Sequence, residues 1–247
     1  MQCLILAGGL GKRLRPITQT IPKTLVEVAG MPFAHHQLSW LARQGVRNVV
    51  YSLGYLGEMV RDFVGDGSRW GLSVSYADEG MELKGTAGAI RLALDKGLLD
   101  SGFLVLYGDS FLPIDILPVW IASDEGQKPL MTVFRNDDEW DKSNVRYVDG
   151  IVELYEKGRI DAGQVGMRHI DYGMSVLTRS VIDEFVSPGK VMDLAAVFYR
   201  LSIDGRLLGF EISKRFYEVG SHDGLADLEA YLSHPQSDLE GQRDRCR

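Results

Sequence analysis

The sequence is poor in cysteine and has no long apolar segment. Only Cys3 and Cys246 occur among its 247 residues. Two cysteines are too few for a disulfide framework or a metal cluster, so we expect unpaired thiols in a reducing cytoplasm. No run approaches the roughly 18 apolar residues that a membrane span requires. The first residues lead straight into a strand-like run without a basic segment, so we expect no signal peptide.

No acidic residue precedes Glu27, although the whole chain carries a formal net charge of -7. The acidic balance disfavours non-specific binding to nucleic acid or to a membrane surface. Before Glu27, positive charge is concentrated on Lys12, Arg13, Arg15 and Lys23. A cationic segment on an acidic protein predicts an anionic ligand, and phosphate is the first choice.

No stretch rich in Pro, Gly or Ser divides the chain, and no internal repeat is visible. We therefore expect one domain over residues 1–233. Residues 234–247 are polar and charged without periodicity, which predicts a disordered tail.

Short apolar runs alternate with helical patterns through the first half of the chain. This alternation predicts βαβ units in an α/β fold, with a doubly wound, mainly parallel, Rossmann-like mixed sheet. Runs without alternating polar positions fit a sheet that is covered on both faces. The expected strands are 2–7, 46–53, 72–76 and 102–107, and the expected helices are 33–44, 56–64 and 86–98.

The second half has a different pattern. Asp149-Gly150 separates two apolar segments, which is a strong hairpin signal. The expected strands are 130–135, 144–148, 151–155, 169–177, 207–212 and 215–219, and the expected helices are 179–185, 192–202 and 224–232.

A glycine-rich turn follows the first expected strand. Gly8, Gly9 and Gly11 can bring backbone N–H groups close to an anion. Two familiar phosphate motifs do not fit. A Walker A loop needs Ser or Thr where Arg13 stands, and a dinucleotide fingerprint needs glycine where Leu14 stands.

This turn resembles the signature of nucleoside-triphosphate sugar-1-phosphate nucleotidyltransferases. The similarity is to small members, such as heptose-1-phosphate guanylyltransferases, N-acetylmuramate-1-phosphate uridylyltransferases and glucose-1-phosphate thymidylyltransferases. It spans residues 2 to about 232. The residues that carry it are Leu6-Ala7-Gly8-Gly9-x-Gly11-x-Arg13-Leu14-x-Pro16, Pro22-Lys23, Gly85-Thr86-Ala87-Gly88-Ala89, Tyr107-Gly108-Asp109, Glu156-Lys157 and Phe216-Tyr217-Glu218-Val219-Gly220-Ser221.

The resemblance implies an enzyme that makes an NDP-sugar and pyrophosphate from an NTP and a sugar 1-phosphate. Attack would be in line, assisted by Mg²⁺ and without a covalent intermediate. Residues 1–110 would form most of the NTP-binding half, and residues 111–233 would form most of the half that binds the sugar phosphate. By resemblance, Arg13 would stabilise the leaving pyrophosphate, Lys23 would hold the acceptor phosphate, and Asp109 would complete the catalytic set.

The resemblance also implies a nucleotide site around the glycine-rich turn. Gly80 stands where several pyrimidine-specific relatives carry glutamine, and Glu82 stands where an acid is common. This slightly favours GTP with a heptose or hexose 1-phosphate, and leaves uridylyl, cytidylyl and thymidylyl transfer open. The implied nucleotide-binding residues are Leu6, Ala7, Gly8, Gly9, Gly11, Lys12, Arg13, Glu82, Gly85 and Thr86.

Two carboxylates are candidates for the metal. Asp109 follows a buried strand at its carboxyl end, where open α/β sheets bind ligands, and Mg²⁺ prefers carboxylate and phosphate oxygens. Glu218 stands where relatives commonly have Asp or Asn, so it is the second expected ligand. For the acceptor, the resemblance implies Lys23, Gly108, Glu156, Lys157, Asp171 and Gly173.

Two other classes of function could use a similar glycine-rich turn. An NAD-dependent oxidoreductase needs an acid after the second strand, where Leu53-Gly54-Tyr55 offers none. A non-catalytic nucleotide-binding module stays open, since it would carry the same turn. The sequence also leaves a homo-oligomer open, because many relatives associate.

Overall fold

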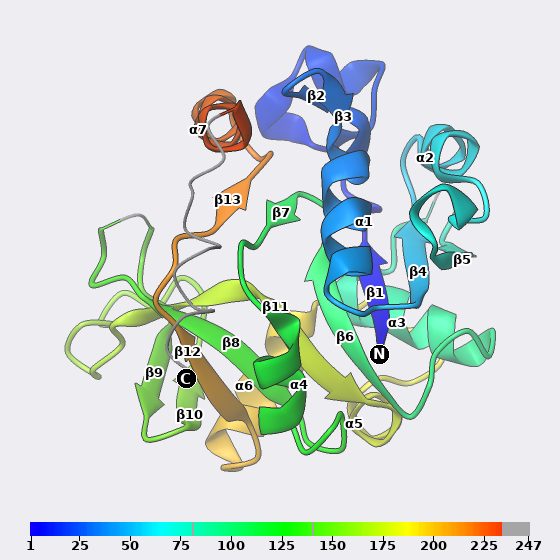
Figure 1. Ribbon diagram of the computed structural model, residues 1–247. Helices are drawn as coiled ribbons and strands as arrows, with labels where there is room; N and C mark the ends of the chain where they lie inside the picture. The colour runs from blue at the N-terminus through cyan, green and yellow to red at the C-terminus, as the bar shows by residue number, and fades with distance from the viewer. Residues whose placement is uncertain (81, 140, 234–247) are drawn as a thin grey trace, which may run out of the picture.

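A nine-stranded sheet forms the centre of the protein (Figure 1). The computed structural model describes residues 1–80, 82–139 and 141–233. Across the sheet, the strands follow the order β5 (Ser73–Asp78), β4 (Asn48–Leu53), β1 (Gln2–Leu6), β6 (Gly102–Tyr107), β11 (His169–Thr178), β8 (Leu130–Arg135), β12 (Leu208–Ile212), β10 (Ile151–Tyr155) and β9 (Val145–Val148).

The direction of the strands changes between the two halves. Strands β5, β4, β1 and β6 are parallel, whereas β11 runs antiparallel to both β6 and β8. Strand β12 is parallel to β8, and β10 and β9 close the sheet as an antiparallel hairpin. Asp149 and Gly150 form its turn with φ of 46° and 87°, the positive values that a two-residue hairpin turn requires. The predicted α/β fold with a mixed sheet is confirmed.

Helices cover both faces of the sheet. Figure 1 shows α1 (Phe33–Arg43) and α4 (Ile116–Ala122) in front, with α3 (Gly85–Asp95) and α6 (Leu194–Ile203) behind. Neighbouring β1 side chains enter different cores: Cys3 and Ile5 join the first, and Leu4 joins the second. This explains why consecutive positions of β1 from Cys3 to Leu6 are apolar, without alternating polar residues. The remaining helices are α2 (Gly57–Val64), α5 (Arg179–Phe185) and α7 (His222–Ser233).

Some elements have no counterpart in the sequence prediction. Helix α4 is one, and the pair β2 (Glu27–Val28) and β3 (Met31–Pro32) is another. A third is β7 (Ser110–Phe111), which pairs with β13 (Tyr217–Glu218) in a separate two-stranded sheet. The segment predicted as a strand over 215–219 is thus a two-residue strand that brings Glu218 opposite Ser110.

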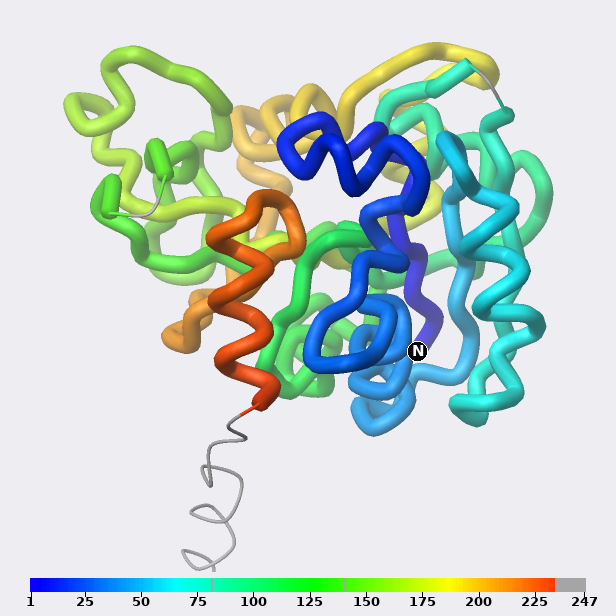
Figure 2. The backbone as a smooth tube through the Cα atoms, turned by 90° about the horizontal axis from the view of Figure 1, so that it is seen from above, coloured from blue at the N-terminus to red at the C-terminus, as the bar shows by residue number. Residues whose placement is uncertain are grey.

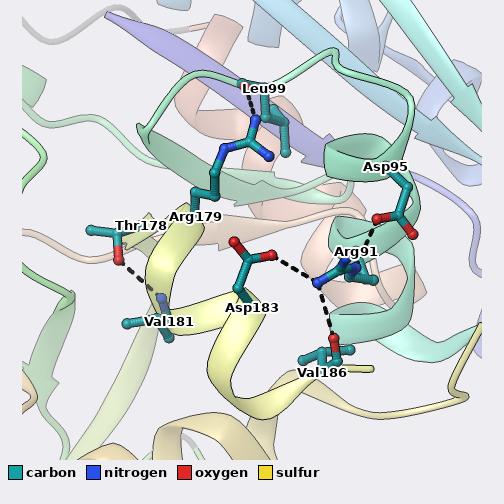
Figure 3. A network of polar contacts seen from close by, with 8 residues as sticks. All are labelled: Arg91, Asp95, Leu99, Thr178, Arg179, Val181, Asp183 and Val186. Carbon is teal, nitrogen blue, oxygen red and sulfur yellow. Dashed lines mark hydrogen bonds and ion pairs between the residues drawn. The ribbon is translucent and has the colours of Figure 1, made fainter. Parts of the chain in front are cut away.

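A polar network fixes α3 against α5 (Figure 3). Arg91 of α3 binds Asp95 on its own helix and Asp183 on α5, each at 2.8 Å. At the start of α5, the Thr178 hydroxyl accepts the Val181 N–H, and the Arg179 guanidinium donates to the Leu99 carbonyl. The network anchors α3, whose amino-terminal end lies at the site described below.

The segment after β1 lies above the carboxyl ends of the parallel strands in Figure 1. Figure 2 looks down on it, in dark blue, between the orange-red α7 and the cyan segments around β4. None of the helices in the described part of the chain is both long and apolar enough to cross a bilayer. The tail predicted over 234–247 lies outside the described residues.

Candidate active site

Two adjoining cavities open at the carboxyl ends of the parallel strands. The smaller has a volume of about 250 Å³ and the larger about 1030 Å³. Tyr107 and Asp109, at the end of β6, line both cavities. One elongated ligand could therefore extend past Asp109 from one cavity into the other, or two ligands, one in each cavity, could come into contact there.

Lys23 and Asp109 form an ion pair beside this junction. The Lys23 Nζ atom lies 2.6 Å from Asp109 Oδ2, and the side chains are only 19% and 24% exposed. Lys23 begins the short 3₁₀ helix Lys23–Leu25, directly after Pro22. The structure therefore brings together two residues that the sequence analysis named as catalytic, from positions 86 residues apart.

Glu218 lies close to Asp109. The Asp109 carbonyl accepts the Val219 N–H at 2.7 Å, and the β7–β13 pairing brings Glu218 opposite Ser110. Burial raises the pKa of Glu218, and the Asp109 carboxylate raises it further, against the opposing effects of Arg13 and Lys23. Both residues line the larger cavity, so the two carboxyl groups border the same space.

These two carboxylates fit a hard divalent cation. Magnesium takes one or two protein carboxylates and completes its shell with phosphate oxygens and water. A larger protein cluster is not required, and the described residues contain no group of three or more His, Cys, Asp or Glu suited to a metal. Burial is the main cause of the raised pKa of Glu218, and the Asp109 carboxylate adds to it; a cation between the two groups would neutralise that negative charge.

The glycine-rich turn divides into two parts. The first part borders the smaller cavity through Leu6, Ala7, Gly8 and Gly9. The second turns away: Gly11 has φ of 58°, and its carbonyl accepts the Thr18 hydroxyl at 2.7 Å.

The two cations after the turn differ in position. Lys12 is exposed and borders neither cavity, whereas Arg13 lines the larger one. A Cβ atom on Gly220 would lie 3.0 Å from Arg13 Nη2, so the guanidinium rests against the segment that follows Glu218. Arg13 is thus brought to the carboxylate pair, and Lys12 is not.

Gly85 and Thr86 line the smaller cavity, as expected, but Thr86 has another role as well. Its hydroxyl accepts the Leu194 N–H at 2.6 Å, at the start of α6. The Ala87 and Gly88 N–H groups donate to the Met192 carbonyl at 3.0 and 3.2 Å. The Ala87 and Gly88 N–H groups at the amino-terminal end of α3 are therefore bonded within the protein and are not open to a ligand.

An acidic residue does face the smaller cavity, but it is Glu79. Glu82 is exposed and borders neither cavity. The Glu79 carboxylate accepts the Lys84 N–H at 2.6 Å and the Ser52 hydroxyl at 3.3 Å. Burial raises its pKa. Neither Glu79 nor Ser52 was predicted from the sequence, although Glu79 directly follows β5, at the sheet edge where ligands of such folds bind.

The larger cavity contains three of the residues expected to hold the acceptor. Lys157, Asp171 and Gly173 all line it. Burial raises the pKa of Asp171, and Lys157 and the Gly173 N–H, which donates to Asp171 Oδ1 at 3.0 Å, oppose that effect. A partly buried carboxylate near an ammonium group suits sugar hydroxyls, which can donate to one and accept from the other.

Two other expected acceptor residues lie elsewhere. Gly108 lines the smaller cavity, where its N–H donates to the Leu6 carbonyl at 2.9 Å. Glu156 borders neither cavity, and its carboxylate binds Arg159 at 2.7 Å.

Aromatic side chains form part of the wall of the larger cavity, and the sequence analysis did not assign them to the site. The ring of Tyr172 lies 6.2 Å from that of Phe134 and 5.6 Å from that of Phe216, centroid to centroid. Tyr172 is only 1% exposed, so it packs against this wall. Aromatic surface beside a carboxylate and an ammonium group is compatible with the apolar face of a sugar ring.

Comparisons with known proteins agree with this geometry. The chain is 35% identical over 237 residues to the D-glycero-α-D-manno-heptose 1-phosphate guanylyltransferase of Aneurinibacillus thermoaerophilus, which covers 95% of this chain and 99% of that protein. It is 34% identical over 243 residues to the probable mannose-1-phosphate guanylyltransferase 2 of Oryza sativa subsp. japonica. That match covers 94% of this chain, and the chain spans only 65% of the plant protein's length.

A solved structure is similar over nearly the whole chain. The crystal structure of HddC from Yersinia pseudotuberculosis complexed with GMP-PN superposes with a TM-score of 0.77 at 26% identity, covering 94% of this chain and 99% of that one. Residues 2–162 match the family model described as nucleotidyl transferase. The family resemblance predicted from the glycine-rich turn is confirmed, and the chain belongs to the nucleotidyl transferase family.

Proposed function

We propose that this protein transfers guanosine monophosphate from GTP to a sugar 1-phosphate, a heptose or hexose 1-phosphate, and releases pyrophosphate. The guanylyltransferases among the relatives support the nucleotide and the acceptor class. The observation that carries the proposal is the position of Asp109, which borders both cavities and pairs with Lys23. One cavity then holds each substrate, and the reaction occurs where they meet.

The smaller cavity is the proposed site of the nucleoside. The backbone of Ala7, Gly8 and Gly9 offers a wall without bulky side chains, against which ribose and phosphate can lie closely. Gly85 borders the same space. The triphosphate would then extend from this cavity towards Asp109 and Arg13.

The larger cavity is the proposed site of the sugar 1-phosphate. Lys157 and Asp171 would bind sugar hydroxyls, and Gly173 allows close approach of the ring. Lys23 would hold the acceptor phosphate, since its ammonium group lies beside the junction. We also propose that residues 1–233 form one domain, with the nucleotide held mainly by 1–110 and the acceptor mainly by 111–233, in a cytoplasmic enzyme.

We propose Mg²⁺ as the divalent ion, held by Asp109 and Glu218. When bound, it would neutralise phosphate charge and favour departure of pyrophosphate. Arg13 would share the charge that develops on the leaving group, through a planar donor set beside Glu218.

The chemistry requires no protein nucleophile. An oxygen of the sugar phosphate forms a bond to the α-phosphorus while the bond to the pyrophosphate oxygen breaks. Among the described residues that line the two cavities there is no cysteine or histidine, so an activated thiol or a serine–histidine pair is not available there. Lys23 and Arg13 therefore act by positioning and by charge.

A pyrophosphate-release screen tests the proposal. GTP, ATP, CTP, UTP and dTTP would each be combined with heptose and hexose 1-phosphates, with Mg²⁺ or with a chelator. We expect release with GTP and one of these acceptors, and none with the chelator. Preference for another NTP would change the assigned nucleotide. Nucleotide binding without release for any acceptor would instead identify a non-catalytic nucleotide-binding module.

A further inference from the structure

Helix α1 carries an amide side chain, that of Gln37, on the face that packs into the core. Gln37 is 0% exposed. The other buried residues of the helix are hydrophobic: Phe33, Ala34, Leu38, Trp40 and Leu41. Glutamine is mostly found on protein surfaces, because burying an amide costs free energy unless its polar atoms find partners. Packing alone therefore does not explain Gln37.

The amide of Gln37 bridges the turn that carries Asp109. The Gln37 Nε2 atom donates to the Tyr107 carbonyl at 3.0 Å and to the Ser110 carbonyl at 2.9 Å. These carbonyls belong to the end of β6 and the start of β7, on either side of Asp109. A side-chain amide has two N–H donors. Both donors of Gln37 are thus used by the backbone that flanks one residue.

The backbone of Asp109 is held by a second element as well. Its carbonyl accepts the Val219 N–H at 2.7 Å. The hydrogen bonds between β6 and β1 end just before it, where the Gly108 N–H donates to the Leu6 carbonyl. Past Gly108, the course of the chain therefore depends on Gln37 and Val219. The direction of the Asp109 carboxylate depends on the same contacts.

The oxygen of the Gln37 amide shows that this side chain lowers stability in one respect. Gln37 Oε1 is buried and has no hydrogen-bond partner among the described residues. Turning the amide over would bring Oε1 against the Tyr107 and Ser110 carbonyl oxygens, which would repel it. A buried acceptor without a partner is destabilising, and a hydrocarbon side chain would avoid that loss. The two hydrogen bonds that flank Asp109 therefore account for an amide at this position.

A fixed backbone beside a metal ligand matters for the reaction. Displacement of a reacting group by about 1 Å can lower turnover by about 100-fold. Gln37 lines neither cavity, so it would touch neither substrate. Building on the proposed function, we infer that Gln37 is a positioning residue, which holds the Asp109 carboxylate where it meets the divalent cation and the phosphates.

Gln37→Met removes both donors and keeps the length of the side chain. The matched control is Gln44→Met, at the carboxyl end of the same helix. Gln44 also bonds to backbone farther along the chain, since its Oε1 accepts the Ile116 N–H at 3.0 Å, at the start of α4. It lines neither cavity. Both variants thus lose contacts from α1 to the backbone, but only Gln37→Met loses those beside Asp109.

Two measurements separate positioning from general stability. The first is kcat for pyrophosphate release with GTP, an accepted sugar 1-phosphate and Mg²⁺, where circular dichroism shows each variant to be folded. The second is binding of Mn²⁺ alone, which takes the same oxygen ligands as Mg²⁺, followed by the EPR signal of free Mn²⁺. We expect Gln37→Met to lower both kcat and Mn²⁺ affinity by about 10–100-fold. Gln44→Met should leave both unchanged, and GTP binding in EDTA should be the same in all three proteins.

Three results would overturn the inference: normal Mn²⁺ affinity in Gln37→Met, equal losses in Gln37→Met and Gln44→Met, or no Mn²⁺ binding by the unaltered protein. If Gln37→Met does not fold, Gln37→Asn replaces it, because an amide that is one methylene shorter cannot reach both carbonyls. The same losses are expected there. Weaker Mn²⁺ binding in Gln37→Met, from a protein that releases no pyrophosphate with any NTP, would refute the proposed function and leave this inference standing. Release from GTP at equal rates in Gln37→Met and the unaltered protein would do the reverse.

Discussion

The Lys23 ammonium group lies 2.6 Å from the Asp109 carboxylate, and Asp109 lines both cavities. Neither side chain is fully buried, so phosphate oxygens and a cation can reach both. The pair thus holds two opposite charges side by side. Under the proposed function, Lys23 would bind the acceptor phosphate and Asp109 the divalent cation.

Replacing Asp109 tests this arrangement. Asp109→Asn keeps the size of the side chain and removes its charge. We expect turnover to fall by about a thousandfold or more in a pyrophosphate-release assay with GTP, an accepted sugar 1-phosphate and Mg²⁺, with the far-UV circular dichroism unchanged. Asp100→Asn, at an exposed position outside both cavities, is the control. Near-normal turnover in Asp109→Asn would contradict the assignment.

Arg13 should depend on its planar donor set as well as its charge. Arg13→Ala is expected to lower kcat by about 10²–10³-fold, because charge on the leaving pyrophosphate loses a donor. Arg13→Lys should recover only part of the loss, since an ammonium group cannot bind two oxygens in the same plane. Arg15→Ala, an exposed cation outside both cavities, controls for the general charge of the segment. Full activity of Arg13→Lys would show that charge alone suffices.

Asp171 should make stability depend on pH. Burial raises its pKa above the ordinary value of 3.8, so the folded state holds this proton more tightly than the unfolded state. Below the ordinary value both states are protonated and burial of charge costs nothing. As pH rises through the raised pKa the carboxyl ionises, and the cost appears in full above it.

Asp171→Asn removes that cost and can still accept the Gly173 N–H. The free energy of unfolding of Asp171→Asn, minus that of the unaltered protein, should therefore be larger at about pH 7 than at about pH 4, so the variant gains stability at the higher pH. Urea unfolding without ligands measures this difference. Lys157→Met removes the cation that opposes the effect of burial on Asp171. This variant should therefore lose more stability than the unaltered protein when the pH rises from about 4 to about 7. The opposite trend in Asp171→Asn would mean that Lys157 outweighs burial.

Gly85 should tolerate alanine much less well than Gly80. Both have positive φ, 72° and 66°. A Cβ atom on Gly85 would lie 2.6 Å from the Met192 carbonyl oxygen, whereas nothing lies within 4 Å of one on Gly80. Gly80→Ala should cost about 1 kcal/mol of stability from backbone strain alone. Gly85→Ala should cost about 2–4 kcal/mol, as measured by urea unfolding. Equal losses would show that the loop before α6 moves aside freely.

Much of the fold could be predicted because the parallel strands are buried on both faces. The six residues of β6, Gly102–Tyr107, are apolar or small for this reason, and such runs are legible in a single sequence. Helix α4 was not predicted from the sequence, because Pro118 lies within it and proline usually interrupts helices. Pro118 lies in the first turn, where no intrahelical N–H donor is needed, so the helix tolerates it.

Site residues that directly follow a strand could be predicted from the sequence. Residues whose position depends on a local hydrogen bond or ion pair were harder to predict. Asp109 follows a strand, and strand ends meet at the ligand edge of the sheet. The course of residues 79–84 depends on the hydrogen bond between Glu79 and the Lys84 N–H. Which acid faces the cavity is set by that bond, so similarity of motif pointed to Glu82. Glu156 faces Arg159 for a comparable reason, since a nearby cation competes for it.

The Thr86 hydroxyl, which accepts the Leu194 N–H, has a consequence for protein engineering. A chimera that imported α6 and the loop before it from another member of the family would inherit a helix start shaped for its donor's own residue at position 86. Without a hydroxyl there, the first turn of the transplanted helix would lose its hydrogen bond to position 86, and the wall of the smaller cavity would shift with it. Position 86 therefore has to travel with α6 in any such exchange.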